Sequence, residues 1–489
     1  MSGPEIKKRP AAPQKGGRGN GCPLYKKCGG CQLQNMTYDE QLSFKQAKCI
    51  RLLSSFGHVD EIIGMARPLH YRNKVQAAFG LTRGGKIISG VYQSASHRIV
   101  CVDDCLLEDE TADAVIVTIR ALLRQFRLSP YNEDTGKGLL RHVLVRRGFQ
   151  SGEVMAVLVT PTAQFPKKHD FLKALLAKHP ELTTVVQNVN GAKTSLVLGE
   201  RSVVWYGKGW ITDTLCGCTF RISPRSFYQI NPVQTEVLYG KAMAFAGLTG
   251  QETVLDAYCG IGTIGLCAAK HAKQVVGVEL NADAVRDAKT NAKLNRADNA
   301  RFVCADAGRF MTEAAKAGER VDVVFMDPPR AGSDLPFLKS VVALAPKRVI
   351  YISCNPETQA RDLVFLCKHG YKVQKIQPVD MFPHTGHVET VVLLVRKTPD
   401  LYIDFKIDLD ESNLTAAEAK PTYDDIKAYV LKTYGLKVST LYISQVKRKL
   451  GLEVGEAYNK SKTDKNKTPQ CPEEKEQAIV AALRYFKMV

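Results

Sequence analysis

The sequence of 489 residues contains no long hydrophobic run. A helix that crosses a membrane needs about 20 consecutive apolar residues, and a secretion signal needs a charged start followed by an apolar segment. Neither pattern is found after Met1 or further along the chain. We therefore expect a cytoplasmic protein with no membrane contact. The length is too great for one hydrophobic core and predicts about two to four domains.

Acidic residues are few relative to basic ones. The chain has 68 lysine and arginine residues against 49 aspartate and glutamate residues, which gives a formal net charge of +19. A surplus of this size favours a polyanionic partner, because lysine and arginine release counterions when they bind phosphates. Nucleic acid is the leading candidate, and a merely soluble basic protein is the alternative.

Cysteine, by contrast, occurs 14 times. In a cytosolic chain such thiols indicate metal binding or catalysis before disulfides. Cys22, Cys28 and Cys31 form a tight group, and the glycines between the last two let the backbone wrap closely around a metal centre. The group lacks the three-and-two spacing of radical AdoMet enzymes, which argues against radical chemistry.

A metal centre of this kind needs a fourth ligand. Cys105 is the best candidate because it follows a strand-like stretch and precedes a helix-like one. Cys101 and Cys49 are weaker candidates. The spacing favours an iron-sulfur cluster or zinc, and a loop without metal remains the alternative.

Residues 67–222 contain short runs in which apolar and polar side chains alternate, such as Val75–Phe79 and Val154–Leu158. This pattern predicts strands of an antiparallel, partly exposed sheet. Basic residues are interleaved with these runs and would make a sheet face suited to an RNA backbone, although an ordinary solvated face is the alternative for any single charge. They are Arg72, Lys74, Arg141, His142, Arg146 and Arg147.

From residue 223 the pattern changes to strands that alternate with helices, which predicts a parallel sheet covered on both faces. One buried strand ends at Asp256 and is followed by a turn with Gly260 and Gly262, and the next strand ends at Glu279. Such glycines let the backbone approach a ligand, and the second acidic residue takes ribose hydroxyls.

Two further acidic residues, Asp306 and Asp327, follow the third and fourth predicted strands. The whole set fits AdoMet better than NAD, because NAD prefers three glycines spaced for a pyrophosphate.

These patterns predict an α/β fold with a doubly wound, Rossmann-like catalytic domain, an N-terminal iron-sulfur and antiparallel β domain, and a small helical extension. Within the N-terminal part, Thr37-Tyr-Asp-Glu40 predicts the start of a helix that ends near Phe56. The predicted regions are a disordered basic tail (1–20), a cysteine-rich segment with a helix (21–66), a central β-rich RNA-binding domain that supplies Cys105 (67–222), the catalytic domain (223–397) and a basic helical extension (398–489).

The run of residues 349–353 is β-branched and aromatic and predicts a buried strand, so Cys354 lies at its carboxyl end, where ligands bind in such sheets. If the ligand is a flipped-out uracil, addition of a thiolate to C6 makes C5 nucleophilic enough to take a methyl group. A base must then remove the C5 proton. Glu389, at the start of a later apolar strand, is the predicted base, with His387 and His384 as second choices.

Together these motifs resemble the AdoMet-dependent RNA uracil-C5 methyltransferases, most closely the iron-sulfur enzymes that methylate 23S ribosomal RNA. The resemblance covers about residues 21–396. It is carried by Cys22-x5-Cys28-x2-Cys31, Phe227-Tyr-Gln229-Ile-Asn231, Asp256-Ala-Tyr258-Cys-Gly260, Asp327-Pro-Pro-Arg330, Ser353-Cys354-Asn355-Pro356 and His387-Val-Glu389.

The resemblance implies a role for each matching residue. It implies a monomer that acts on RNA, 23S rRNA before or during ribosome assembly, with transfer RNA as the alternative target. The implied roles are Cys354 as nucleophile, Glu389 as proton acceptor, Gln229, Tyr258, Glu279 and Asp327 as AdoMet contacts, and Cys22, Cys28, Cys31 and Cys105 as ligands of a 4Fe-4S cluster.

The chain departs from the family pattern at both ends. Only the short basic tail precedes Cys22, where many members have a small RNA-binding domain, and the helical extension after residue 397 is additional. This extension, with Lys447, Arg448 and Lys449, is either a replacement RNA-binding module or a structural brace.

Three other functions are alternatives to uracil methylation. A cytosine-C5 enzyme should have a Pro-Cys step at Asp327-Pro-Pro-Arg330, and an amino-methyltransferase should have an aromatic residue where Arg330 stands. A non-catalytic RNA-binding or ribosome assembly factor would not need Cys354 and Glu389.

Overall fold

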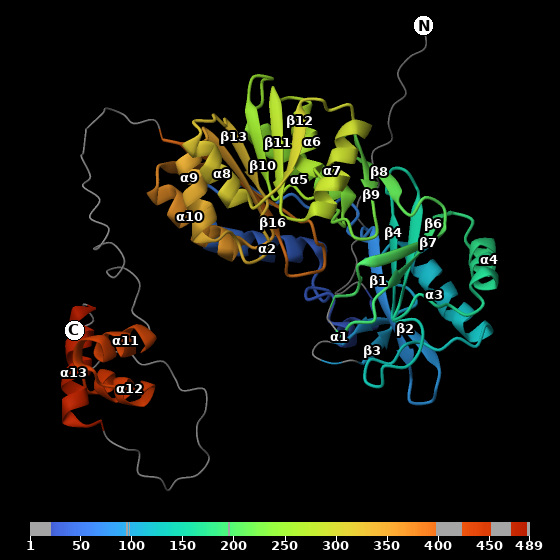
Figure 1. Ribbon diagram of the computed structural model, residues 1–489, viewed down its shortest axis with the longest axis horizontal. Helices are drawn as coiled ribbons and strands as arrows, with labels where there is room; N and C mark the ends of the chain where they lie inside the picture. The colour runs from blue at the N-terminus through green and yellow to red at the C-terminus, as the bar shows by residue number, and fades with distance from the viewer. Residues whose placement is uncertain are drawn as a thin grey trace. The chain divides into compact units, whose positions relative to one another are not determined.

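The computed structural model describes residues 21–397, apart from 94–95, 97 and 194–195, together with residues 423–450 and 471–486 (Figure 1). The chain divides into two compact units, Met1–Thr398 and Pro399–Val489. The predicted basic tail (1–20) and a lysine-rich linker near residues 459–468 lie outside the described residues. Within the described ranges, every helix is too short or too polar to span a lipid bilayer.

The catalytic part of the first unit is built on a seven-stranded sheet with the order β12-β11-β10-β13-β14-β16-β15. The first five of these strands are parallel, and β16 runs antiparallel to both of its neighbours. The strands are β10 (Thr253–Ala257), β11 (Gln274–Glu279), β12 (Ala300–Cys304), β13 (Val323–Met326), β14 (Arg348–Ser353), β15 (Tyr371–Val379) and β16 (Glu389–Arg396). This is the predicted doubly wound arrangement.

Helices cover both faces of this sheet (Figure 1). Neighbouring residues of one strand enter opposite cores: Val254 packs with one and Leu255 with the other, because side chains alternate along a strand. The first core takes side chains from α5 (Pro232–Ala246), α6 (Thr263–Ala269) and α7 (Ala282–Leu294), and the second takes them from α8 (Ala307–Lys316), α9 (Leu335–Leu344) and α10 (Pro356–Lys368).

The N-terminal helix also packs against the catalytic sheet. After the one-turn helix α1 (Tyr25–Cys28), helix α2 (Tyr38–Leu53) begins with the predicted capping box, in which the Thr37 hydroxyl accepts from the Glu40 amide and the Glu40 carboxylate accepts from the Thr37 amide. Cys49 and Leu53 are fully buried in the second core, so α2 covers the catalytic domain.

The central domain contains a second seven-stranded sheet with the order β3-β2-β1-β4-β5-β6-β7, and helices α3 (Glu110–Gln125) and α4 (Lys168–Lys178) pack on one face. Its strands are β1 (Lys74–Leu81), β2 (Ile87–Tyr92), β3 (Ile99–Cys101), β4 (His142–Arg147), β5 (Val154–Thr160), β6 (Leu182–Val189) and β7 (Arg201–Tyr206). A hairpin of β8 (Ile211–Leu215) and β9 (Cys218–Ile222) leads to the catalytic domain.

The prediction that the central sheet is purely antiparallel is wrong, because β5 and β6 are parallel. The α4 helix makes the crossover that a parallel pair requires. The burial of all seven residues of β5 reflects this position, since α3 and α4 cover one face and the catalytic core lies against the other.

The second unit contains three described helices, α11 (Tyr423–Tyr434), α12 (Thr440–Lys449) and α13 (Glu473–Tyr485). Ile426, Ile443 and Ile479 are fully buried in their shared core.

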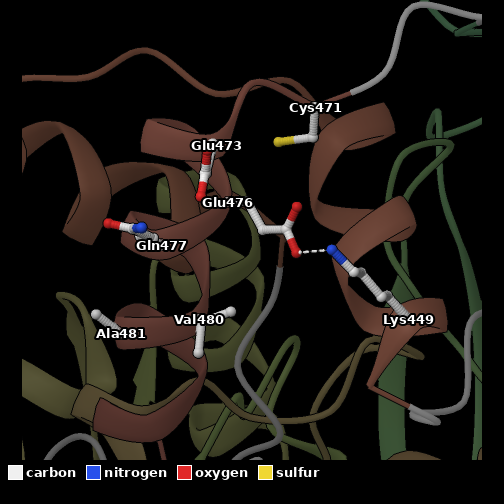
Figure 2. Close-up of a pocket in the computed structure, with 7 residues that line it drawn as sticks. All are labelled: Lys449, Cys471, Glu473, Glu476, Gln477, Val480 and Ala481. Atoms are coloured by element: carbon white, nitrogen blue, oxygen red, sulfur yellow. Dashed lines mark hydrogen bonds and ion pairs between the residues drawn. The ribbon is translucent and has the colours of Figure 1, made fainter.

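The basic residues at the end of α12 mostly have partners within this unit. Lys447 is buried over the ring of Tyr423 at 4.8 Å. Figure 2 shows Lys449 and Glu476, 2.5 Å apart, facing each other beside a cavity of about 780 Å³ between α12 and α13. Two of the three basic side chains proposed for RNA contact therefore have structural partners.

Candidate active site

Cys354 and Glu389 lie at the same edge of the catalytic sheet. Cys354 follows the last residue of β14, and Glu389 is the first residue of β16. Because β16 is antiparallel to β14, with Ser353 paired to Thr390, the end of one strand lies beside the start of the other. The Thr390 hydroxyl donates to Gln359 of α10 at 2.6 Å, which fixes this pairing from the helix side.

The environment of Cys354 disfavours the thiolate in the absence of ligands. Burial raises the pKa of the Cys354 thiol to about 11, the negative charges of Glu389 and Asp327 add to the rise, and the Arg330 guanidinium opposes it through its charge and a hydrogen bond. Arg330 also lies 3.4 Å from His387, measured from Nη2 to Nε2. Arg330 is therefore the positive group that faces the thiol.

Glu389 and Asp327 are carboxyl groups that hold protons unusually firmly. Burial raises the pKa of Glu389 well above its usual value, and Asp327 adds to the shift while Arg330 opposes it. Burial alone raises the pKa of Asp327 to about 7. A buried carboxylate with a raised pKa is a stronger base than an exposed one, which suits a proton acceptor.

The turn after β10 has the features of a cradle for a cationic ligand. Burial raises the pKa of Asp256 to about 8, and its Oδ1 has no hydrogen-bond partner among the described residues, although Oδ2 accepts from the Gly265 amide at 2.7 Å. Gly260, at a φ of 55°, has open space where a Cβ would stand. The Glu279 carboxylate accepts from the Gly260 amide at 3.1 Å. A positively charged ligand such as AdoMet fits a site in which a buried carboxyl oxygen lacks a hydrogen-bond partner among the described residues.

A cavity of about 420 Å³ lies next to this turn. Tyr258, at a φ of 65°, packs against Phe337 with ring centroids 4.9 Å apart, and Asp306 lines the same cavity. Phe337 was not predicted, because it lies on α9, far from the glycine turn in sequence, and no local motif marks it. The two rings form a wall suited to a flat heterocycle.

Gln229 belongs to a segment that precedes α5. It is 9% exposed, and its backbone carbonyl accepts from Asn73 Nδ2 at 3.1 Å. Phe227, two residues before Gln229, is 65% exposed. Asn231, two residues after Gln229, donates to the Met381 carbonyl at 3.0 Å. The segment therefore connects the central domain to the loop that precedes Glu389.

This loop, residues 380–387, is held by the N-terminal helix α2. Lys45 and Asp380 form a fully buried ion pair at 2.6 Å, and Tyr38 donates to the second Asp380 oxygen at 2.9 Å. The backbone amide of His384 donates to the Gln41 side-chain oxygen at 2.8 Å, and His384 has a left-handed backbone conformation. His384, one of the second-choice bases, therefore has a structural role.

Cys31, one of the four predicted metal ligands, lies next to this loop, because the Gly386 amide donates to the Gln32 side chain at 3.2 Å and the Leu33 amide donates to the His384 carbonyl at 3.0 Å. Cys31 and Cys105 pack against one small apolar cluster around Met65. Burial raises the pKa of Cys31 to about 11, Arg72 opposes the rise, and the charges of Cys28 and Cys22 add to it. Within the described ranges, however, no three Cys, His, Asp or Glu side chains are arranged to hold a metal ion. The four thiols are suitable ligands for an iron-sulfur cluster, but they are not arranged around a common point.

The predicted basic face of the central sheet is mostly turned to internal partners. Arg141 forms a two-point ion pair with Glu133 at 2.9 Å and 3.0 Å. Arg146 is buried and donates to the Ser226 carbonyl, and Arg147 pairs with Asp109 at 2.8 Å. These arginines hold the fold together, so the interpretation of a continuous basic surface is wrong for them.

The chain is similar to known RNA methyltransferases. The family model described as tRNA (Uracil-5-)-methyltransferase matches residues 216–397. An RNA methyltransferase of Clostridium acetobutylicum is 43% identical over 382 residues, which are 77% of this chain and 83% of that protein. A second, from Halalkalibacterium halodurans, is 45% identical over 381 residues, with 77% and 83% covered.

Among solved structures, the Pyrococcus abyssi tRNA (uracil-54, C5)-methyltransferase in complex with S-adenosyl-L-homocysteine is 31% identical, with a TM-score of 0.64. The match covers 75% of this chain and 86% of that one. The chain belongs to the RNA uracil-C5 methyltransferase family. As a member of this family it is an RNA methyltransferase that uses S-adenosylmethionine, as the resemblance of its motifs predicted.

Proposed function

We propose that this RNA uracil-C5 methyltransferase transfers a methyl group from AdoMet to C5 of a specific uridine in 23S rRNA, through a covalent bond between Cys354 and C6. The observation that carries the proposal is the placement of Cys354 and Glu389 side by side at the ligand-binding edge of the sheet, fixed by the pairing of β14 with β16.

In the first step the Cys354 thiol gives up its proton to solvent, and the thiolate sulfur uses its electron pair to form a bond to C6 of uracil. The C5=C6 electron pair moves toward the C4 carbonyl, so that negative charge reaches C5. Arg330 assists because its positive charge and hydrogen bond favour the thiolate against burial. AdoMet supplies an electrophilic methyl carbon, which C5 attacks as the methyl–sulfur bond breaks and its electron pair stays on sulfur.

In the second step Glu389 takes the proton from C5. The C5–H electron pair re-forms the C5=C6 bond, and the sulfur of Cys354 leaves C6 with its electrons. The raised pKa of Glu389 supports this role, because a carboxylate that binds protons firmly accepts one from carbon more readily.

The residues that would hold AdoMet surround the turn after β10. Gln229, Tyr258, Glu279 and Asp327 were implied by the resemblance, and the packing of Phe337 against Tyr258 adds a further contact surface. The partnerless Asp256 oxygen supports a positively charged occupant.

The covalent step is tested with RNA that contains 5-fluorouridine, which blocks proton removal and traps the adduct. We expect the wild-type protein to form an adduct that survives denaturation. Cys354→Ala should form none while still binding AdoMet and RNA. Cys367→Ala, a half-buried cysteine on α10, is the matched control and should behave as wild type. An adduct with Cys354→Ala would refute the assignment.

The choice of 23S rRNA depends on the cysteine spacing, whereas the solved relative from Pyrococcus abyssi acts on uracil 54 of tRNA. Transfer RNA is therefore the second candidate. Mapping of 5-methyluridine in both RNA classes, from cells with and without the gene, separates the two. Loss of a tRNA site with intact rRNA would overturn the first choice.

We also propose that Cys22, Cys28, Cys31 and Cys105 bind a 4Fe-4S cluster with a structural role, since no redox step occurs in the reaction. The support is the chemistry of the donor set and the shared packing of Cys31 and Cys105. Protein purified without oxygen should carry about four iron and four sulfide per chain. Cys105→Ser should lose that iron, and iron retained by this variant would contradict its role as ligand.

A further inference from the structure

The sheet of the central domain has two unlike faces. Val75 and Phe79 of β1 point into the core covered by α3 and α4. Lys74, Gln76 and Ala78 alternate with them and therefore lie on the opposite face. Part of this second face packs against the catalytic core, through residues of β4, β5 and β6. The part beside β1 and β2 is hollowed.

The hollow is a cavity of about 640 Å³, within the range of about 300–1,000 Å³ typical of ligand sites. Ala78 and Gly90, paired across β1 and β2, form a floor without bulky side chains. Tyr92 and His142 line the same cavity, with ring centroids 6.1 Å apart and nearly perpendicular planes. A flat floor bordered by two rings suits a planar heterocycle.

His142 supplies a polar group without a partner. It is 7% exposed, and its Nδ1 lacks a hydrogen bond to any residue that the structure describes. Burial, aided by the charge of Arg141, lowers the pKa of His142 to about 4, so the ring is neutral at physiological pH. A neutral imidazole offers one donor and one acceptor. This pairing matches the mixed donor and acceptor edge of a nucleobase.

A phosphate is a poorer occupant of this pocket. The nearby guanidinium of Arg141 is already engaged by Glu133 and by the backbone carbonyls of Asn190 and Ala192. Lys193 also lines the cavity but is exposed to solvent, and a neutral ring with a paired arginine adds little attraction for a phosphate charge.

Strand β1 links the pocket to the segment that carries Gln229. Asn73, immediately before β1, donates from its backbone to the Ile230 carbonyl at 3.0 Å and from its side chain to the Gln229 carbonyl. Lys74 and Gln76 then lead along the same face to Ala78, over about 14 Å of extended strand. The pocket therefore lies about four strand residues from the segment that holds Gln229.

We propose that the pocket formed by Ala78, Gly90, Tyr92 and His142 holds a second unpaired nucleobase, a few nucleotides from the uridine that is methylated. The inference rests on the proposed methylation of RNA and adds a base that is read without being modified. Stacking beside Tyr92 gives affinity, and the two nitrogens of His142 give base preference.

The test is an abasic scan with the full-length protein. A synthetic RNA stem-loop centred on the mapped uridine carries an abasic nucleotide at each neighbouring position in turn, and affinity is measured by fluorescence anisotropy. We expect one position to weaken binding about ten-fold, the effect of one lost stacking contact. His142→Phe should weaken binding of the intact RNA by a similar factor and should be insensitive to the abasic nucleotide at that position.

His169→Phe, the same substitution at an exposed site on α4 and on the other face of the sheet, is the matched control and should retain the wild-type scan. A scan with no sensitive position, or equal sensitivity in wild type and His142→Phe, would overturn the proposal. If His142→Phe fails to fold, ultraviolet crosslinking of wild type to 4-thiouridine at the sensitive position decides. A crosslink to the peptide with Tyr92 or the peptide with His142 supports the pocket, and crosslinks to other peptides alone refute it.

The experiments distinguish an error in the proposed base-binding pocket from an error in the proposed reaction. A normal 5-fluorouridine adduct with a flat abasic scan would remove the pocket and keep the reaction. A position-specific scan without any adduct would keep the pocket and remove the covalent mechanism.

Discussion

Arg330 should set the reactivity of Cys354, and this can be measured without substrate. The Cys354 pKa of about 11 means that only about one thiol in 10⁴ is ionised at neutral pH. A positive charge a few ångströms away shifts a pKa by about one to three units, and we take the lower end because Arg330 is solvent-exposed. Arg330→Met should therefore raise the thiol pKa by about one unit, which is ~1.4 kcal/mol.

The assay is alkylation by iodoacetamide over a series of pH values, followed at the peptide that contains Cys354 by mass spectrometry. Because only the thiolate reacts, Arg330→Met should react about ten-fold more slowly than wild type at any pH below both pKa values. Arg330→Lys keeps the charge and should stay closer to wild type. Arg286→Met, an exposed arginine on α7, is the matched control. An Arg330→Met profile that coincides with wild type would refute the electrostatic account of the thiol.

Three further outcomes are expected from the structure. Lys45→Met should lower the free energy of unfolding by about 3–5 kcal/mol in urea titrations, because it leaves Asp380 charged and buried. The double variant Lys45→Met with Asp380→Leu should recover much of the lost stability. Equal stability of the single and double variants would contradict this account of the ion pair. Phe337→Ala should weaken AdoMet binding about ten-fold by calorimetry with RNA affinity unchanged, and unchanged AdoMet affinity would exclude the ring as a contact. In the folded protein the pKa values of Asp256 and Asp327 are raised from about 4 to about 8 and 7, so the ligand-free protein should lose thermal stability as the pH rises from 4 to 8. Sinefungin has a cationic amine in place of the sulfonium and should restore more thermal stability at pH 8 than S-adenosylhomocysteine does. Equal shifts in melting temperature with the two ligands would count against a charge-complementary site.

The parts of the fold that depend on local sequence were predicted correctly. The run before Cys354 is the buried strand β14, and Thr37 with Glu40 makes the capping box at the start of α2. Both signals are contained within a few neighbouring residues, so one sequence is sufficient to recognise them.

The parts that depend on distant partners were missed or misread. Lys45 and Asp380 are 335 positions apart, and nothing local predicts that they form a buried pair. Arg141 and Arg146 were interpreted as surface charges, yet their partners, Glu133 and Ser226, become neighbours only in the folded chain. The parallel pairing of β5 with β6 was missed for a similar reason, since periodicity within a strand does not report the direction of its neighbour.

The pairing of β14 with β16 has a consequence for how this enzyme can diversify. The nucleophile and the proton acceptor belong to one hydrogen-bonded ribbon, locked by Thr390 and Gln359, and not to separate loops. Insertions, appended helices or a changed RNA surface can therefore accumulate elsewhere without altering the distance between the two reacting groups. New RNA targets can be acquired around a chemical centre that itself stays constant.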